Sequence, residues 1–124
     1  MSGINGHPGY VRDIVQGESR KIKVHPIFTD ENGVVQSVTL SDYDFKITFA
    51  ADLDTSTPAD LEVTVPAGTG LDSELTTVEI NVNATQTAGL PVGEEYYQIT
   101  MINASDSSEA HIMDMGKINI LPAV

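Results

Sequence analysis

Three carboxylates in one stretch of the chain are the first candidates for chemistry. Asp52 and Asp54 flank Leu53, and Asp60 follows shortly after them. A hard cation such as Ca²⁺ binds six to eight oxygen ligands, and acidic residues at alternating loop positions can supply some of them. The spacing does not match an EF-hand, and a solvated acidic loop is the commoner explanation. The sequence therefore identifies no metal ligand, and leaves open whether this loop binds Ca²⁺.

Histidine and nucleophile patterns give no indication of an active site. His7, His25 and His111 are far apart, and none belongs to an HExxH motif or another paired-ligand motif. No stretch resembles a nucleophile elbow, and the absence of cysteine excludes thiolate chemistry and disulfides. We therefore expect no enzyme activity, no catalytic residue and no cofactor.

The tyrosines offer a different kind of chemistry, because an aromatic ring can stack on a sugar. Tyr96 and Tyr97 are adjacent and could form such a platform. The structural alternative is that one tyrosine packs in the core while its hydroxyl bonds to a backbone group at a nearby corner, and we expect this role. A sugar-binding module would also need an aromatic side chain at a loop tip, for which Tyr10 and Tyr43 are best placed.

The charge balance restricts the possible partners. The 124 residues include 18 acidic and 6 basic ones, a net charge of −12, and the only basic cluster is Arg20, Lys21 and Lys23. Nucleic acids and anionic membranes need clustered cations, so we expect neither as a partner. An acidic surface suits a basic protein face or a divalent cation. The sequence starts without a signal-peptide pattern and has no apolar run long enough to span a bilayer.

The rest of the chain predicts a single β domain. Residues 1–10 are rich in Gly and poor in apolar groups, which predicts a flexible arm, and residues 11–124 form the one domain. Alternating apolar and polar residues, bounded by turn residues, predict the strands. Pro26 implies an edge position or a bulge, and Asn32-Gly33 predicts a tight hairpin turn. The predicted strands cover residues 11–16, 20–28, 43–50, 61–65, 76–82, 96–101 and 111–121.

Two features near the end of the chain complete the prediction. Residues 87–93 contain Gly89, Pro91 and Gly93, which predict a corner where the chain crosses between sheets. In the last strand the apolar period slips, and a bulge at Gly116 would place Met113, Met115, Ile118 and Ile120 on one side. No segment shows a helical period. We therefore predict an all-β fold: an immunoglobulin-like, Greek-key antiparallel sandwich of about seven strands.

Several of these turns resemble a known family. The run 17–24, the turn Asp30-Glu31-Asn32-Gly33, and the corner 87–93 before Tyr96-Tyr97-Gln98-Ile99 resemble the Ig-like β-sandwich domains of tailed-phage virions. Those include the N-terminal domain of baseplate upper proteins and similar tail or head accessory proteins. The resemblance covers residues 17–121 and rests on turn and strand signatures. The chain ends at Val124, where a baseplate upper protein continues, which favours an accessory, decoration or connector subunit. The family supplies no catalytic residues.

The functional expectation follows from the resemblance and from the exposed edges of a lone sandwich. We expect a non-enzymatic structural virion protein, assembled in the host cytoplasm, that forms homo-oligomers in the particle. It would bind capsid, tail or baseplate subunits through sheet edges, loops and the N-terminal arm, with strand 20–28 as a candidate edge. The alternative is a carbohydrate-binding or adhesive module that contacts the host surface. The location in head or tail, the copy number and the symmetry are left open.

Overall fold

The computed structural model describes residues 11–36, 38–54 and 56–123, so the predicted arm, Tyr10 and His7 lie outside the described residues. The described chain is mostly β-strand with very little helix, which confirms the all-β prediction. The strands are β1 (Ile14–Val15), β2 (Arg20–Val24), β3 (Phe28–Thr29), β4 (Val35–Gln36), β5 (Tyr43–Ala50), β6 (Leu61–Val65), β7 (Val78–Val82), β8 (Gly93–Asn103) and β9 (Ala110–Leu121). A short 3₁₀ turn, η1 (Leu40–Asp42), precedes β5, and one short helix, α1 (Ala84–Ala88), precedes β8.

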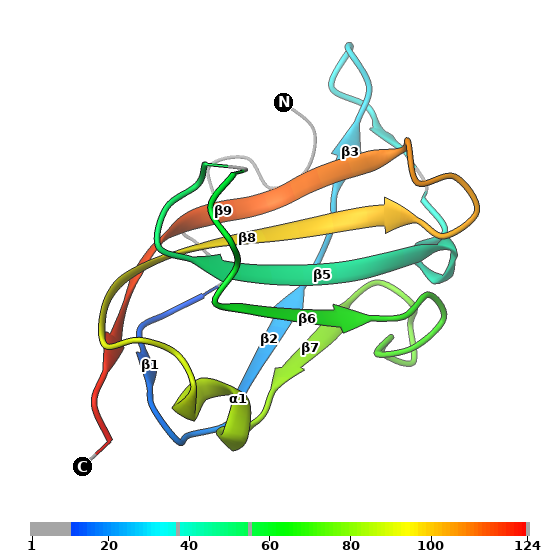
Figure 1. The fold of residues 1–124 in the computed structure, drawn as a ribbon. Helices are drawn as coiled ribbons and strands as arrows, with labels where there is room; N and C mark the ends of the chain where they lie inside the picture. Colours follow the sequence, from blue (N-terminus) through cyan, green and yellow to red (C-terminus); the bar gives the residue numbers. More distant parts are fainter. Residues whose placement is uncertain (1–10, 37, 55, 124) are drawn as a thin grey trace.

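Five strands form the main sheet, in the order β1-β9-β8-β5-β6 (Figure 1). All its pairs are antiparallel except β1 with β9, which is parallel. The alternation along the central strands works as the sequence predicts. Phe45, Ile47 and Phe49 of β5 are buried, and so are Tyr97, Ile99 and Met101 of β8.

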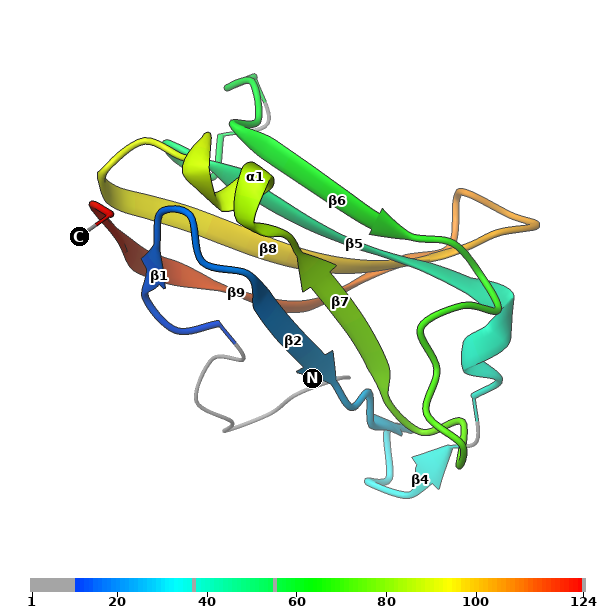
Figure 2. The ribbon, with the colours of Figure 1, turned by 90° about the horizontal axis from the view of Figure 1, so that it is seen from below.

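The two-stranded ribbon β2–β7 lies across the buried face of this sheet (Figure 2). Its register sets Ile22 opposite Ile80, and both side chains are almost completely buried. The ribbon and the sheet thus enclose one continuous hydrophobic core. Among the described residues no helix is both long enough and apolar enough to cross a bilayer.

The corner of residues 87–93 joins the ribbon to the main sheet, as predicted, because β7 precedes it and β8 follows it. Gly93 has a φ of 121°, a conformation that glycine adopts at no steric cost. The sequence analysis missed α1. The helix begins with a capping box, in which Asn83 and Gln86 bond each other's backbone N–H.

The hydroxyl of Thr87 fastens this corner to the turn between β1 and β2. It accepts a hydrogen bond from the Gly17 N–H at 3.0 Å and donates one to the Glu18 carbonyl at 2.9 Å. The side-chain amide of Gln16 also donates to the Leu90 carbonyl at 2.7 Å. Side-chain hydrogen bonds therefore join the crossing to the turn after β1 at two places, Thr87 and Leu90.

The predicted strand 20–28 is two strands. β2 ends at Val24, and the chain resumes as β3 at Phe28, because Pro26 has no N–H to give to a ladder. The predicted hairpin at Asn32-Gly33 is confirmed as the turn between β3 and β4, with Gly33 at a φ of 80°.

The predicted bulge at Gly116 is wrong. The register of β8 with β9 shifts at Ile99 and Thr100, which face Asp114 and Ile112, so the extra residue is Met113. Met113, Ile118 and Ile120 are buried as expected, but Met115 is exposed. Gly116 has another role: a Cβ there would lie 3.1 Å from the Tyr97 ring, so glycine leaves space for that ring.

Candidate interaction surfaces

The acidic loop does not form a cation site in the described chain. Asp52 and Asp54 each accept a backbone N–H from the residue two positions later, which are local turn bonds. The bonds from the Ser56 N–H and hydroxyl lower the pKa of Asp54. Asp60 instead bonds to Glu95. In the part of the chain that is described, no group of His, Asp and Glu side chains could hold a metal ion.

The described histidines have separate partners. His25 lies 3.4 Å from the Thr77 hydroxyl, whereas His111 lies 3.2 Å from Glu109. Around His111 the groups form one polar cluster. The Tyr43 hydroxyl and the Asn103 amide both donate to the Glu109 carboxylate. Tyr43, one of the aromatics expected at a loop tip, is thus half-buried and hydrogen-bonded, and the bond to Glu109 raises its pKa to about 12.

Tyr96 and Tyr97 separate completely, because successive side chains of a strand point to opposite faces. Tyr97 is buried, as expected, and its hydroxyl donates to the Asp114 carboxylate of β9 at 2.9 Å. The hydroxyl also has a backbone partner, as predicted, but this partner is Val11 and does not lie at the corner. Burial and the Asp114 carboxylate raise the pKa of Tyr97. Tyr96 is half-buried on the outer face of the main sheet.

Glu95 is a buried acid that the sequence analysis did not single out. Its side chain is 1% exposed, on the core side of β8, and its Oε2 has no hydrogen-bond partner in the described protein. Burial and the hydrogen bond to Asp60 raise its pKa to about 8. The only sequence signal was its parity, which it shares with Tyr97 and Ile99. A buried acid of this kind makes the stability of the fold depend on pH. Glu95 does not line any of the hollows described below.

A cluster of exposed apolar side chains lies beside the β3–β4 hairpin, and we call it the hairpin surface. Ile27, Val35 and Leu75 are 44%, 68% and 60% exposed and line one shallow hollow, which is floored by Phe28, Val38 and Leu40. The hollow has a volume of about 210 Å³. Leu75 also has a φ of 60°, a conformation disfavoured for a side chain of its size. Exposed apolar side chains gathered in this way mark interaction sites.

The β2 edge is a second unpaired feature of the ribbon. Within the described residues β2 pairs only with β7, so one side of β2 has no strand next to it, which agrees with the predicted edge. Lys21 and Lys23 are exposed on its outer face. Edge strands of this kind pair with extended segments of other chains unless something blocks them.

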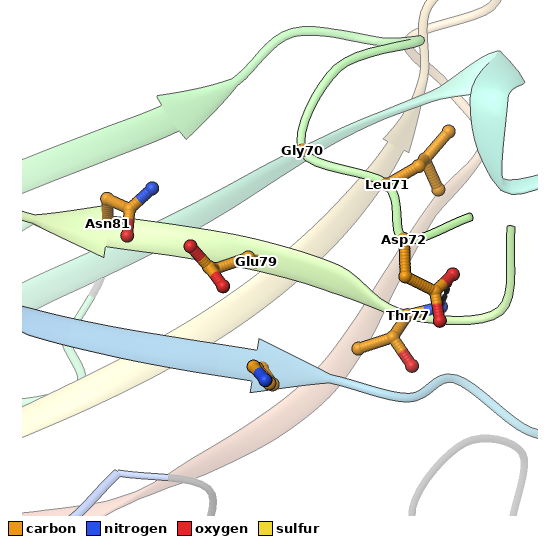
Figure 3. Close-up of a pocket in the computed structure, with 7 residues that line it drawn as sticks. Gly70, Leu71, Asp72, Thr77, Glu79 and Asn81 are labelled. Carbon is orange, nitrogen blue, oxygen red and sulfur yellow. Dashed lines mark hydrogen bonds between the residues drawn. The ribbon is translucent and has the colours of Figure 1, made fainter. Parts of the chain in front are cut away.

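Figure 3 shows a hollow on the outer face of the ribbon, about 380 Å³ in volume. Lys23 of β2 and Glu79 of β7 are cross-strand neighbours in it, and Asn81 lies further along β7. Asp72 contributes no free carboxylate, because its Oδ1 accepts from the N–H groups of Thr76 and Thr77 and its Oδ2 accepts from the Thr76 hydroxyl. These bonds, led by that from the Thr76 N–H, lower the pKa of Asp72. Lys23, Glu79 and Asn81 are therefore the charged and amide side chains of this hollow that remain for a ligand.

The larger hollow lies on the outer face of the main sheet, over β5, β6 and β8. We call it the outer groove, and its volume is about 490 Å³. Its floor consists of alternate residues of these strands, and the loop after β5 forms one wall. The floor residues are Lys46, Thr48, Ala50, Glu62, Tyr96, Gln98 and Thr100, and the wall includes Asp52, Leu53, Asp54 and Thr57.

Comparisons with known proteins do not identify a family. No protein-family model and no curated protein matches the sequence. Among solved structures, a candidate glycoside hydrolase from Bacteroides vulgatus ATCC 8482 matches with a TM-score of 0.47 and 12% identity, over 92% of this chain but only 17% of that one. The PmoD soluble domain from Methylocystis sp. ATCC 49242 (Rockwell) matches with a TM-score of 0.44 and 9% identity, over 94% and 82%. Similarity this distant gives no information about function.

Proposed function

We propose that this protein is a non-enzymatic structural subunit that binds other proteins, as an accessory, decoration or tail-type component of a tailed-phage virion. The hairpin surface carries the proposal. Ile27, Val35 and Leu75 expose apolar side chains at one place, and a protein partner would remove them from water. Within the described residues, one side of β2 has no partner strand, so this edge offers backbone pairing as well. The resemblance of the turn motifs to virion domains supplies the assignment to a particle.

Charge indicates what kind of partner fits. Glu74 precedes Leu75, and Asp30 and Glu31 lie in the hairpin turn next to β3 and β4. An apolar centre with acidic neighbours, on a protein of net charge −12, complements an apolar patch with basic neighbours. We propose such a face on the capsid, tail or baseplate subunit to which the protein binds, with further contacts between its own copies in the particle.

We also propose a finer fold assignment: the protein is an immunoglobulin-like sandwich of the variable type. The order β9-β8-β5-β6 corresponds to strands G, F, C and C′ of that type, and β2 and β7 correspond to B and E of the opposite sheet. The connection from β7 through α1 to β8 then corresponds to the crossing from E to F. The correspondence supports the assignment.

Mass spectrometry of purified phage particles from the source cell tests the proposal directly. We expect the chain in the particles at a fixed ratio to the major structural protein. The binding surface is tested with Val35→Asp, and the matched control is Val92→Asp, which changes an equally apolar side chain, 57% exposed, at the distant corner. Val35→Asp should reduce incorporation into particles at least about tenfold, and Val92→Asp should not. Absence of the chain from particles, or equal effects of the two variants, would overturn the proposal.

A further inference from the structure

We propose that the outer groove binds a short neutral or amino-sugar oligosaccharide. The groove is on the main sheet, whereas the hairpin surface lies beside the ribbon, so the two binding functions are independent. Ligand pockets in proteins have volumes of roughly 300 to 1,000 Å³. The outer groove, at about 490 Å³, is within this range.

Tyr96 supplies the stacking platform. It is half-buried, so its ring is held by the sheet and still accessible from the groove. Its neighbour across the β5–β8 pair is Ala50, whose methyl group is too short to cover the ring. Its neighbour across the β8–β9 pair is Lys117, whose ammonium group is paired with Glu94 at 2.9 Å. Within the described chain the Tyr96 hydroxyl makes no hydrogen bond, so it is available to a ligand. An aromatic ring with an apolar face and a polar tip fits a sugar ring, which has apolar C–H faces and a polar rim.

A row of short polar groups continues the floor beyond the ring. The register pairs Thr48 with Gln98, and Lys46 with Thr100. Gln98 also donates one amide N–H to the Thr100 hydroxyl at 3.3 Å, so its carbonyl oxygen and its second N–H are the groups that remain for a ligand. Hydroxyl and amide groups both donate and accept hydrogen bonds, and so does each hydroxyl of a sugar. Strand neighbours lie about 4.8 Å apart, so the row presents a regular two-dimensional array of such groups. A rigid sheet holds this array in place before the ligand arrives, which lowers the entropic cost of binding.

The charges of the groove exclude acidic sugars. Lys46 is bound to Glu62 at 3.2 Å, so the only cation of the floor is already neutralised. Asp52 and Asp54 on the wall add negative charge. The net charge of the groove is therefore negative and would repel a carboxylated or sulfated sugar. The same carboxylates can accept hydrogen bonds from neutral sugars and pair with the amino groups of amino sugars.

Isothermal titration and ¹⁵N–¹H NMR with cellobiose, maltose, lactose, N,N′-diacetylchitobiose and chitosan disaccharide test the site. We expect at least one of these probes to bind and to shift the amide signals of β5 and β8 selectively. Tyr96→Ala should weaken that binding at least about tenfold, and Gln98→Ala about fivefold, typical of a lost anchor and a lost hydrogen bond. The matched control is Asn81→Ala, which changes the floor of the hollow in Figure 3 and should leave the affinity unchanged.

Two outcomes would overturn this inference. One is that no probe shifts a signal of β5 or β8 even at about 10 mM, a concentration that detects very weak binding. The other is that Tyr96→Ala and Gln98→Ala bind as the unaltered protein does while their thermal unfolding is normal. If Tyr96→Ala fails to fold, Gln98→Ala alone decides the question, because Gln98 is on the outer face and the sheet does not depend on its packing. Incorporation into particles, the readout for the hairpin surface, is not affected by any of these results.

Discussion

At the scale of single residues, Glu95 is the buried acid of the described structure, and one of its carboxyl oxygens has no hydrogen-bond partner there. A carboxylate in a hydrophobic core loses its hydration, and the loss is recovered only by pairing or by taking up a proton. Among the described residues, Glu95 forms no ion pair with a cation. It has the Asp60 carboxyl group as a partner, which further favours the protonated form of Glu95. At neutral pH the protein therefore holds a proton that a solvent-exposed glutamate would have released.

This proton makes stability depend on pH with a defined sign. The pKa of Glu95 rises from its usual 4.5 to about 8 in the folded protein. Between these values the folded state binds one proton more than the unfolded chain, so the free energy of unfolding falls as the pH rises. The slope for one group is about 1.4 kcal/mol per pH unit, and the total loss is on the order of a few kcal/mol.

Glu95→Gln should abolish this dependence, because the amide is neutral at every pH. Urea unfolding at pH values of about 5, 6.5 and 8 measures it. The control is Glu94→Gln on the same strand, which removes only the exposed pair of Glu94 with Lys117, 2.9 Å apart, and should keep the slope. The same slope in Glu95→Gln and in the unaltered protein would show that Glu95 is ionised in the fold.

Alanine substitutions at Gly68 and Gly70 can distinguish the cost of backbone strain from the cost of steric overlap. Gly68 and Gly70 have φ angles of 82° and 72°, so alanine at either site adopts a left-handed conformation that costs about 1 kcal/mol. A Cβ at Gly68 meets nothing within 4 Å, but at Gly70 it would lie 2.8 Å from a Val65 methyl group and 3.0 Å from the Glu79 carbonyl oxygen. Gly70→Ala should therefore destabilise the protein by about 1 to 3 kcal/mol more than Gly68→Ala. Denaturant melts of the two variants give the difference, and equal losses would refute the overlap.

At the scale of elements, the sequence predicts the strands whose apolar and polar residues alternate regularly. β5 alternates without interruption, and its predicted bounds are those of the structure. The helix α1 has only five residues, too few to show a helical period, and its capping box of Asn83 and Gln86 was the one available signal. The bulge in β9 was misplaced because a change of parity shows that an extra residue exists without locating it. Pairing with β8 locates it at Met113.

The candidate surfaces show the same limit. The sequence places Tyr96, Gln98 and Thr100 on one outward face, and that part of the outer groove was predictable from alternation alone. Its wall depends on how the loop after β5 folds, which no local pattern gives. The hairpin surface was less predictable still. Alternation places Ile27 on the face opposite Ile22, but no local pattern brings Ile27 together with Val35 and Leu75.

The corner before β8 should depend on one hydroxyl. Thr87 is completely buried and joins α1 to the turn after β1 through its bonds with Gly17 and Glu18. Thr87→Val keeps the shape but leaves these backbone groups unpaired, which should cost about 1 to 3 kcal/mol of unfolding free energy. Thr85→Val, at an exposed position of the same helix, controls for the helix propensity of valine and should change stability by less than about 0.5 kcal/mol. Similar losses in both would show that the hydroxyl bonds contribute nothing.

At the scale of the whole molecule, the net charge of −12 acts on folding and on binding in opposite directions. The ion pairs of the described residues are at the surface, with side chains about one-third or more exposed, so they offset little of the mutual repulsion of the carboxylates. Salt screens that repulsion, since the Debye length falls to about 10 Å at 0.1 M. The same salt weakens the attraction to a basic partner, because that attraction depends on the same unscreened charges.

We therefore expect the two responses to have opposite signs in one titration. Between about 0.01 and 0.3 M NaCl, the free energy of unfolding should rise, and the affinity for the partner subunit should fall. Thermal melts and a binding assay in the same buffers measure both, and sucrose at matched viscosity controls for effects unrelated to charge. Glu74→Gln, beside Leu75 of the hairpin surface, should reduce the salt dependence of binding more than Glu62→Gln, whose carboxylate lies in the outer groove and is paired with Lys46. An affinity that rises with salt would show that the contact is apolar and would refute the basic face that we propose for the partner.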